Sequence, residues 1–463
     1  MNKLLGLYSL LACLCISGCE ENIPSSARPT PLADAAIEST STEISQTDAD
    51  PIQATDQTDP SENLSPLVPD KNDWPWWRGA GADGRSHGDN VPTRWSATEN
   101  IAWRTAVPGR GHASPIVWGD RVYLASADEQ AEKQLLLAFD RNTGDQIWNR
   151  EVHQGEFMAK HGKNSHASAT PACDGERIYS VFVNHSALNV TATDLDGKQV
   201  WQTNAGTFGS EHGYGSSPVL HKSLVIVLGD NLQRCFVAAL DRSTGRVVWR
   251  TDRKTTGRHG SYATPIVAEV AGKPQLLVSG MHSTSSYNPE TGKLIWTCSG
   301  PAEVTACTLA FNDRLVFSSG GYPEKELLAI RANGRGDISK SHVVWRTGKG
   351  VTYVPSPICH KGKLYVVGDN GVTTCFEAET GKQVWQGRLE GNFSASPVCA
   401  GDLIFVTNEA GKTYVFRAGS KFEIVAQNDL GGGGFASPAI CGGQIFLRSE
   451  QQLFCIGKPD ATN

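Results

Sequence analysis

The chain has 463 residues and a formal net charge of −6, and it contains 48 Gly and 12 Trp but only 3 Met. It shows no sign of the basic surface that nucleic-acid binding requires, and long stretches with helical periodicity are absent from the sequence. A chain of this length usually forms two to four domains.

Residues 1–19, MNKLLGLYSLLACLCISGC, have the form of a secretory signal. One cation, Lys3, precedes an apolar run that is too short to span a bilayer. Ile16-Ser17-Gly18-Cys19 resembles the bacterial lipoprotein cleavage box, which predicts that Cys19 becomes the lipidated first residue of an exported protein. An ordinary signal peptide with a chance cysteine is the alternative. Glu20 after the cysteine is compatible with sorting to the outer membrane.

Most of the negative charge lies directly after this signal. Residues 20–73 contain 12 acidic and 2 basic side chains, whereas residues 74–463 contain 39 basic and 36 acidic ones. The first of these segments has no aromatic residue and many Ser, Thr, Pro and Asp residues, so it cannot bury enough apolar surface to fold. It is predicted to be a disordered acidic tether.

Residues 74–99 begin with three tryptophans, Trp74, Trp76 and Trp77, followed by Arg78. We expect this segment to pack onto the folded domain, with carbohydrate stacking on the rings as the alternative. GAGADG at 79–84 matches G-x-G-x-x-G, but no strand precedes it and no helix pattern follows. A dinucleotide site is therefore not predicted there.

A nine-residue phrase then recurs along the chain. Its copies are DRNTGDQIW (140–148), TDLDGKQVW (193–201), DRSTGRVVW (241–249), NPETGKLIW (288–296) and EAETGKQVW (377–385). The Thr-Gly pair predicts a tight turn whose Gly has a positive φ. The Ile/Val–Trp pair places adjacent large side chains on opposite faces of a strand, so we expect both faces to be covered.

A second signal precedes each phrase: Ser or Thr followed by Pro, an apolar stretch, a short turn and another strand. Proline suits the first residue of such a strand because it need not donate to a ladder. Examples are SPIVWGDRVYLAS (114–126), SPVLHKSLVIVLG (217–229), TPIVAEVAGKPQLLVSG (264–280), SPICHKGKLYVVG (356–368), SPVCAGDLIFVTN (396–408) and SPAICGGQIFLRS (437–449). In the fifth unit, VTACTLAF (304–311) replaces this signal.

The two signals together define a unit of four strands. The outermost strand is marked eight times, at Trp103, Trp148, Trp201, Trp249, Trp296, Trp345, Trp385 and Val425. The last unit lacks its outer strand, and the first Trp phrase, NIAWRTAVP (100–108), lacks the strands before it. The sequence therefore predicts an all-β, eight-bladed β-propeller over residues 100–457, in which an N-terminal strand completes the last four-stranded antiparallel blade. A linear solenoid is the alternative. Residues 458–463 form a C-terminal tail.

These repeats resemble the PQQ-like (quinoprotein) β-propeller family over residues 100–457. With the lipoprotein box, the chain is similar to the BamB-type propeller lipoproteins of the β-barrel assembly machine. This resemblance implies a non-catalytic docking platform in the cell envelope, on the periplasmic face of the outer membrane. Its partners would be envelope proteins, including barrel-assembly components, bound by a monomeric propeller, with no nucleic acid involved.

The resemblance also raises the alternative that the protein is an enzyme, a quinoprotein-type or metal-dependent oxidoreductase. Quinoprotein dehydrogenases hold PQQ over the ring with Ca²⁺ and typically carry a vicinal Cys-Cys disulfide and often a CxxCH haem site. This sequence has no adjacent cysteines and no CxxCH, and its propeller is shorter. We therefore predict neither a catalytic residue nor a bound cofactor, with PQQ and Ca²⁺ as the alternative.

The loops that join one blade to the next carry the candidate binding residues at the channel entrance. These are His112, His166, His212, Tyr214, His259, Tyr262, Tyr353, Phe393 and Phe435. Clustered imidazoles could bind a transition metal or an anionic ligand or move protons, so the metal question stays open. Alternatively, each His caps its own loop. Glu211 is the one carboxylate in these loops, which weakens a case for Ca²⁺ or for acid–base catalysis.

Nine cysteines follow Cys19. Cys173, Cys359, Cys399 and Cys441 each come two or three residues after a Pro and are expected to fill the innermost strands as small apolar side chains. Cys298 and Cys307 flank one inter-blade loop and are the candidate pair for a disulfide in an exported protein.

Overall fold

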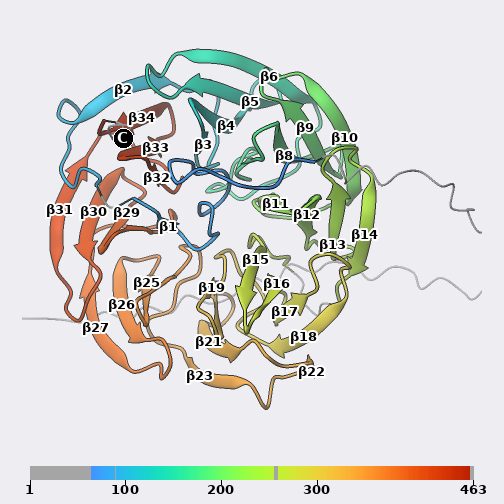
Figure 1. Ribbon diagram of the computed structural model, residues 1–463, viewed down its shortest axis with the longest axis vertical. Coiled ribbons are helices and arrows are strands. Elements are labelled where there is room, and N and C mark those ends of the chain that lie inside the picture. The colour runs from blue at the N-terminus through green and yellow to red at the C-terminus, as the bar shows by residue number, and fades with distance from the viewer. Residues whose placement is uncertain (1–63, 89, 255–258, 459–463) are drawn as a thin grey trace, which may run out of the picture. The chain divides into compact units, whose positions relative to one another are not determined.

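A computed structural model describes residues 64–88, 90–254 and 259–458. This part of the chain consists of strands, turns and loops, and the strands form eight sheets arranged as a ring around a central axis (Figure 1). The predicted eight-bladed propeller is confirmed. The signal sequence, Cys19 and the tether up to residue 63 lie outside the described residues. Within the described ranges, no helix is long and apolar enough to cross a membrane.

Each blade is a four-stranded antiparallel sheet whose first strand faces the channel and whose last strand forms the rim. In chain order, the strands of blades 1 to 4 are β3 (Ile116–Trp118), β4 (Arg121–Asp128), β5 (Lys133–Asp140), β6 (Gln146–Gln154); β7 (Ala172–Cys173), β8 (Arg177–Asn184), β9 (Ala187–Asp194), β10 (Gln199–Thr207); β11 (Val219–His221), β12 (Leu224–Gly229), β13 (Phe236–Asp241), β14 (Val247–Asp252); β15 (Ile266–Val270), β16 (Lys273–Gly280), β17 (Ser283–Tyr287) and β18 (Leu294–Ser299).

The strands of blades 5 to 8 are β19 (Ala310–Phe311), β20 (Leu315–Gly320), β21 (Glu326–Arg331), β23 (Val343–Thr347); β24 (Ile358–His360), β25 (Lys363–Val367), β26 (Val372–Glu377), β27 (Gln383–Arg388); β28 (Val398–Ala400), β29 (Leu403–Thr407), β30 (Lys412–Arg417), β31 (Ile424–Asp429); β32 (Ala439–Cys441), β33 (Gln444–Arg448), β34 (Gln452–Ile456) and β2 (Ile101–Ala106). Two short strands were not predicted. β1 (Arg85–Ser86) pairs in parallel with β28, and β22 (Gly336–Asp337) pairs in parallel with β18.

The ring is closed by strands from the two ends of the described chain. β2 pairs antiparallel with β34, and Trp103 faces Cys455 in the register. The predicted completion of the last blade by an N-terminal strand is therefore confirmed. Blade 8 is held together by a ladder between residues that are more than 300 positions apart in the sequence.

Each rim strand that carries the repeated tryptophan contains a β-bulge one residue before it. In β6, Trp148 pairs with Ala138 and Gln146 pairs with Phe139, so Ile147 has no partner on the neighbouring strand. The expectation that both faces of this strand are covered is wrong, because the bulged residue points outward and Ile147 is 43% exposed. In blade 7 the bulge falls at Val425, so Ala426 rather than Val425 occupies the tryptophan position.

The repeated phrase exists because it joins adjacent blades. The indole of Trp103 donates a hydrogen bond from Nε1 to the carbonyl of Arg141, at 2.8 Å, in the turn of the next blade. Gly144 of that turn has a φ of +77°, and a Cβ on it would lie 2.5 Å from the Trp103 ring. The same indole-to-carbonyl bond recurs at Trp148, Trp201, Trp249, Trp345 and Trp385.

The Ser/Thr-Pro signal has a related purpose at the channel. The backbone N–H of Ser114 donates to the hydroxyl of Thr170 at 3.0 Å, and the same link repeats from blade to blade. The belt of hydroxyls runs through Ser114, Thr170, Ser217, Thr264, Thr308, Ser356, Ser396 and Ser437. Thr308 keeps this position in the divergent fifth unit although Leu309 replaces the proline. Among these described residues only the link from Thr264 to Thr308 is missing.

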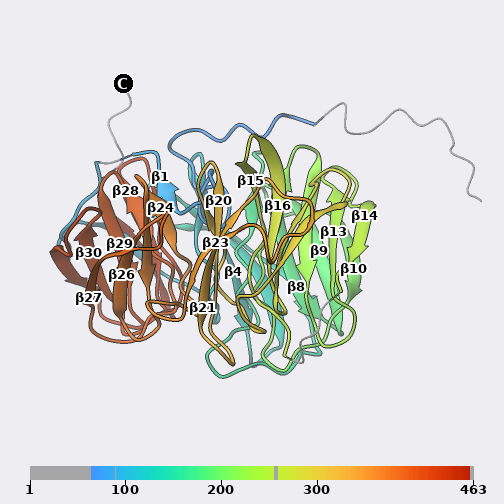
Figure 2. The ribbon, with the colours of Figure 1, turned by 90° about the horizontal axis from the view of Figure 1, so that it is seen from below.

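Residues 64–88 run across one face of the ring before β2 begins (Figure 2). Trp74 pairs with Val117 of β3, and Trp77 donates from Nε1 to the Thr308 hydroxyl at 2.8 Å, the position that the belt leaves open. The predicted tether extended to residue 73, but Ser65 already bonds to Glu176 and accepts from Arg242, so this boundary lies too late in the sequence.

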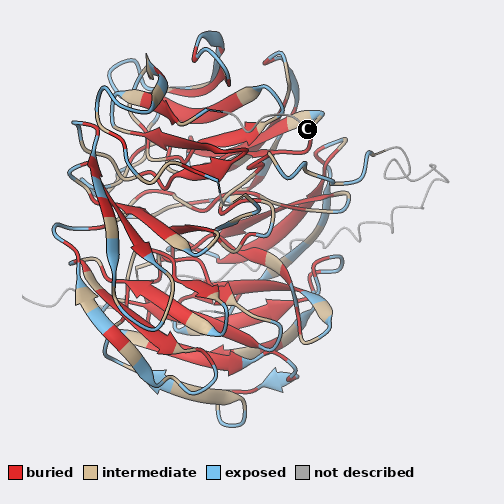
Figure 3. Ribbon diagram, turned by 60° about the vertical axis from the view of Figure 1, so that its left-hand side comes forward, coloured by how far each residue is buried: buried red, intermediate tan, exposed pale blue. Residues whose placement is uncertain are grey.

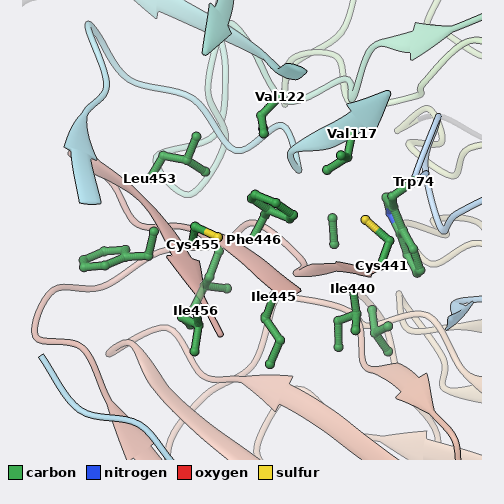
Figure 4. Close-up of a cluster of buried hydrophobic side chains, with 14 of the residues drawn as sticks. Trp74, Val117, Val122, Ile440, Cys441, Ile445, Phe446, Leu453, Cys455 and Ile456 are labelled. Carbon is green, nitrogen blue, oxygen red and sulfur yellow. The ribbon is translucent and has the colours of Figure 1, made fainter. Parts of the chain in front are cut away.

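The core lies between the blades. Strands near the channel are almost entirely buried, whereas the rim strands alternate between buried and exposed residues (Figure 3). At the ring closure, Trp74 packs beside Cys441 in a cluster with Val117, Ile445 and Phe446 (Figure 4).

The nine cysteines after Cys19 are buried, and Cys298 and Cys307 carry free thiols. The candidate Cys298–Cys307 disulfide is therefore wrong. The Cys307 thiol instead donates to the carbonyl of Ser319 at 3.1 Å.

Candidate functional site

A cavity of about 630 Å³ opens at the end of the channel where the inter-blade loops lie. We call it the mouth cavity. It is built by the loops that lead from each rim strand to the next inner strand and by the turns between the second and third strands of blades 5 to 7. A narrower space of about 100 Å³ continues inward from it and ends at Trp77. The channel is therefore a well that Trp77 closes at its floor.

Six of the nine predicted binding residues line the mouth cavity. They come from blades spread around the ring and are His112, His212, Tyr262, Tyr353, Phe393 and Phe435. Their side chains gather because every inter-blade loop leads into the beginning of an inner strand, and these strand ends all lie around the same end of the channel. His112 lies against Phe435, with ring centroids 4.5 Å apart, and His212 lies 6.0 Å from the Tyr262 ring.

The other three predicted residues are used within the protein. His166 stacks on Phe157 at a centroid distance of 4.1 Å. The Tyr214 hydroxyl donates to the carbonyl of Leu228, and burial raises the pKa of this phenol. The Nδ1 atom of His259 lies 2.9 Å from Oε1 of Glu303. The repeat predicts where each loop lies but not the direction of each side chain.

The charged residues of the mouth cavity were not among the predicted binding residues. Lys163 and His161 come from the long loop between blades 1 and 2, and Lys325, Asp369 and Glu409 come from turns between second and third strands. Glu211 is the one carboxylate of the inter-blade loops, but Asp369 and Glu409 reach the cavity from hairpin turns. The hairpin turns DNG at 369–371 and NEAG at 408–411 were the available signal, since these turns open on the same face.

Both carboxylates already have partners. Glu409 forms an ion pair with Lys163 at 2.9 Å and accepts a hydrogen bond from the Ser394 hydroxyl at 2.7 Å. The two oxygens of Asp369 accept the backbone N–H groups of Tyr353 and Val354, at 2.9 and 3.0 Å. Asp369 therefore shapes the loop that carries Tyr353, and Glu409 ties blade 7 to the loop between blades 1 and 2.

The imidazole of His112 is held neutral. Burial and the nearby cations Arg110, Arg448 and Lys160 lower its pKa to about 3. Its Nε2 atom is buried and makes no hydrogen bond within the described residues. Desolvation likewise raises the pKa of Tyr353 to about 12. Neither group is tuned for proton transfer near neutral pH.

The donor set does not fit a Ca²⁺–PQQ site. Across the described ranges, no group of three His, Cys, Asp or Glu side chains could hold a metal ion. Ca²⁺ requires six to eight oxygen ligands, whereas Asp369 and Glu409 are committed to backbone amides, Lys163 and Ser394.

Comparisons with known proteins agree with the propeller family that the sequence repeat indicated. Residues 89–232, 233–336 and 323–421 match a family model described as "Outer membrane protein assembly factor BamB". The chain is 24% identical over 377 residues to the outer membrane protein assembly factor BamB of Yersinia pestis, covering 78% of this chain and 88% of that protein. It is 22% identical over 344 residues to a tetrathionate hydrolase of Acidithiobacillus ferrooxidans, covering 67% of this chain and 65% of that protein.

A solved structure, a europium-containing methanol dehydrogenase, superposes with a TM-score of 0.59 at 13% identity, covering 84% of this chain and 98% of that one. At this identity the likeness extends to the fold alone.

The ring of eight blades, its tryptophan docking bonds and its channel closed at one end define a PQQ-like β-propeller. Since the matched segments span well over half of the sequence, the chain belongs to the family of outer membrane protein assembly factor BamB.

Proposed function

We propose that this protein is a non-catalytic interaction platform of the cell envelope that takes part in the assembly of outer-membrane proteins. The observation that carries the proposal is the match to the Yersinia pestis assembly factor over 88% of that protein's length. The alignment covers 78% of this chain, which is more than a few blades contain. The platform would act as a monomeric propeller without a cofactor.

The chemistry of the mouth cavity supports a binding role. Its two carboxylates are committed to partners, and its most buried imidazole is neutral. A general acid or base needs a titrating group within reach of a substrate, and a nucleophile needs an adjacent base. Aromatic rings with polar groups around them are instead typical of protein-interaction sites.

Anchoring through Cys19 is part of the same proposal. Acyl chains on this residue would hold the protein on the periplasmic face of the outer membrane, and the acidic tether would let the propeller reach its partners. Intact mass measurement of the protein from its own cells tests this directly. An unmodified mature chain, or retention of a Cys19→Ala variant on the outer membrane, would contradict it.

The central test is crosslinking of the full-length protein in its own cells, followed by identification of the partners. Outer-membrane assembly components should be recovered in stoichiometric amounts. Native mass spectrometry of the same preparation tests the competing oxidoreductase reading. Stoichiometric PQQ or metal, together with activity lost on its removal, would overturn the platform proposal.

A further inference from the structure

The well at the mouth cavity has one open end. Trp77 closes the floor, and its indole N–H is fixed to the Thr308 hydroxyl at 2.8 Å. The narrow part above Trp77 has a volume of about 100 Å³, far smaller than the mouth cavity at about 630 Å³. An extended polypeptide therefore cannot thread through the ring. An occupant has to insert an end, a turn or a side chain.

The upper part of the well is lined by aromatic rings from several blades. His112, Tyr262, Tyr353 and Phe435 are each only partly buried, in contrast to the docking tryptophan Trp148, which is 6% exposed. Ring faces left open to a cavity favour an aromatic guest, because offset and edge-to-face ring pairs add about 0.5–1.5 kcal/mol to area burial. His112 and Phe435 contact each other, with centroids 4.5 Å apart, and the cavity meets the parts of these rings that this contact leaves exposed.

The charges of the well argue against a polyanionic ligand. The lining contains two lysines, Lys163 and Lys325, and two carboxylates, Asp369 and Glu409, whose formal charges cancel. Lys163 is already paired with Glu409. A ligand with several carboxylates or phosphates would have one unpaired cation, Lys325, available to it.

Polar groups with free hydrogen-bonding capacity remain at the well. The side-chain amide of Asn392 is exposed at the rim, and the buried Nε2 of His112 makes no hydrogen bond within the described residues. An amide at the rim can bond to a peptide backbone, and a buried, unsatisfied ring nitrogen costs free energy that a bound donor or acceptor would recover. This combination of a buried aromatic pocket and a polar rim is the anatomy of an interface hot spot.

We propose that the mouth cavity receives an aromatic side chain carried at the tip of a loop of a protein partner, with the rings as the pocket and the Asn392 rim as the backbone contact. This proposal rests on the proposed platform function and names the type of contact. The cavity volume exceeds that of one side chain and suits a loop tip of a few residues.

The test uses the full-length protein and two disulfide-closed hairpin peptides that differ only at the tip, Trp or Ala. Calorimetric titration should give at least about tenfold tighter binding of the Trp hairpin, as expected for a hot-spot ring. Asn392→Trp fills the rim and should weaken binding of the Trp hairpin by at least about tenfold. Asn142→Trp is the matched control. It adds the same side chain at an exposed turn away from the mouth cavity and should leave binding unchanged.

Equal binding of the two hairpins would overturn the proposal, as would an Asn392→Trp variant that binds like the parent. Free N-acetyltryptophanamide binding as tightly as the hairpin would also overturn it, because the loop would then contribute nothing.

Crosslinking in cells separates this proposal from the platform function. Partners lost by Asn392→Trp but kept by Asn142→Trp would support both. If both variants keep the partners, the platform function stands and the proposed insertion of an aromatic side chain is wrong. A parent protein without partners would refute the platform function itself.

Discussion

Acidification from about pH 7.5 to about pH 5 should destabilise the propeller, and His112→Phe should remove about 2 kcal/mol of that loss. Burial and three nearby cations lower the pKa of His112 to about 3, whereas an unfolded chain has a histidine pKa of about 6.5. Between these two pKa values, the His112 imidazole is therefore protonated in the unfolded state and neutral in the folded state. The free energy of unfolding is unaffected above about pH 6.5 and falls as the pH decreases toward 3.

The magnitude follows from the two pKa values. At pH 5 the unfolded imidazole is almost fully protonated and the folded one is not, which costs about 2 kcal/mol by RT ln[(1 + 10^1.5)/(1 + 10^−2)]. A folded pKa of about 4 would change this figure little, because the unfolded pKa dominates at that pH. His166 provides a second case, since burial lowers its pKa to about 4. Because His166 is only half-buried, solvent screens its interactions, and His166→Phe should show a smaller reduction in the same direction.

The assay is urea-induced unfolding of the parent, His112→Phe and His166→Phe at the two pH values. Phenylalanine keeps the ring contact with Phe435 at position 112. The comparison uses the loss between the two pH values within each protein, so a constant effect of the substitution cancels. If His112→Phe loses as much stability on acidification as the parent, His112 is protonated in the folded state and the argument from burial is refuted.

Three further changes test the contacts between and within blades. Gly144→Ala should destabilise by at least about 1 kcal/mol more than Gly119→Ala in thermal unfolding, because both glycines have a positive φ but only the former would press a Cβ against Trp103, at 2.5 Å; equal losses would show that the ring simply moves aside. Arg253→Met should cost about 3–5 kcal/mol in urea unfolding because it leaves the buried Asp230 unpaired, and adding Asp230→Leu should restore most of the stability; a double variant as weak as the single one would contradict this. Ser396→Ala should cost about 1–3 kcal/mol by leaving the buried N–H of Ser356 without an acceptor, while Ser396→Thr keeps the hydroxyl and most of the stability. Equal melting temperatures for these two variants would mean that the belt bond contributes nothing.

The number of blades and the closure of the ring could be predicted because both follow from counting the repeated units and the incomplete units at the two ends. Eight rim phrases and two complementary fragments leave one arrangement, and β2 pairs with β34 as expected. The bulge before each tryptophan could not be predicted, because it depends on how Trp103 and its equivalents seat on the next blade's turn. It is also the reason that Ile147 is exposed and that Ala426 takes the place assigned to Val425.

The candidate site was predicted in outline only. A repeat places equivalent loops at one end of the channel, which is why six aromatic and histidine positions meet there. Whether a side chain points inward depends on local packing, and His166, Tyr214 and His259 found partners elsewhere. Glu409 was missed because its ion pair with Lys163 joins positions 246 residues apart.

The closure of the ring by β2 and β34 has a consequence for the order of events during synthesis. Trp103 emerges from the ribosome early, and its ladder partner Cys455 emerges 352 residues later (455 − 103). Closing a free loop of that length would cost about 5 kcal/mol of chain entropy, but blades that have already stacked bring the two ends together beforehand. We therefore expect blade 8 to form last. A chain that stops short of residue 452 would keep its seven other blades but lack β34, which leaves unpaired edges on β33 and β2 of blade 8. Such edges would mark incomplete products for aggregation or degradation.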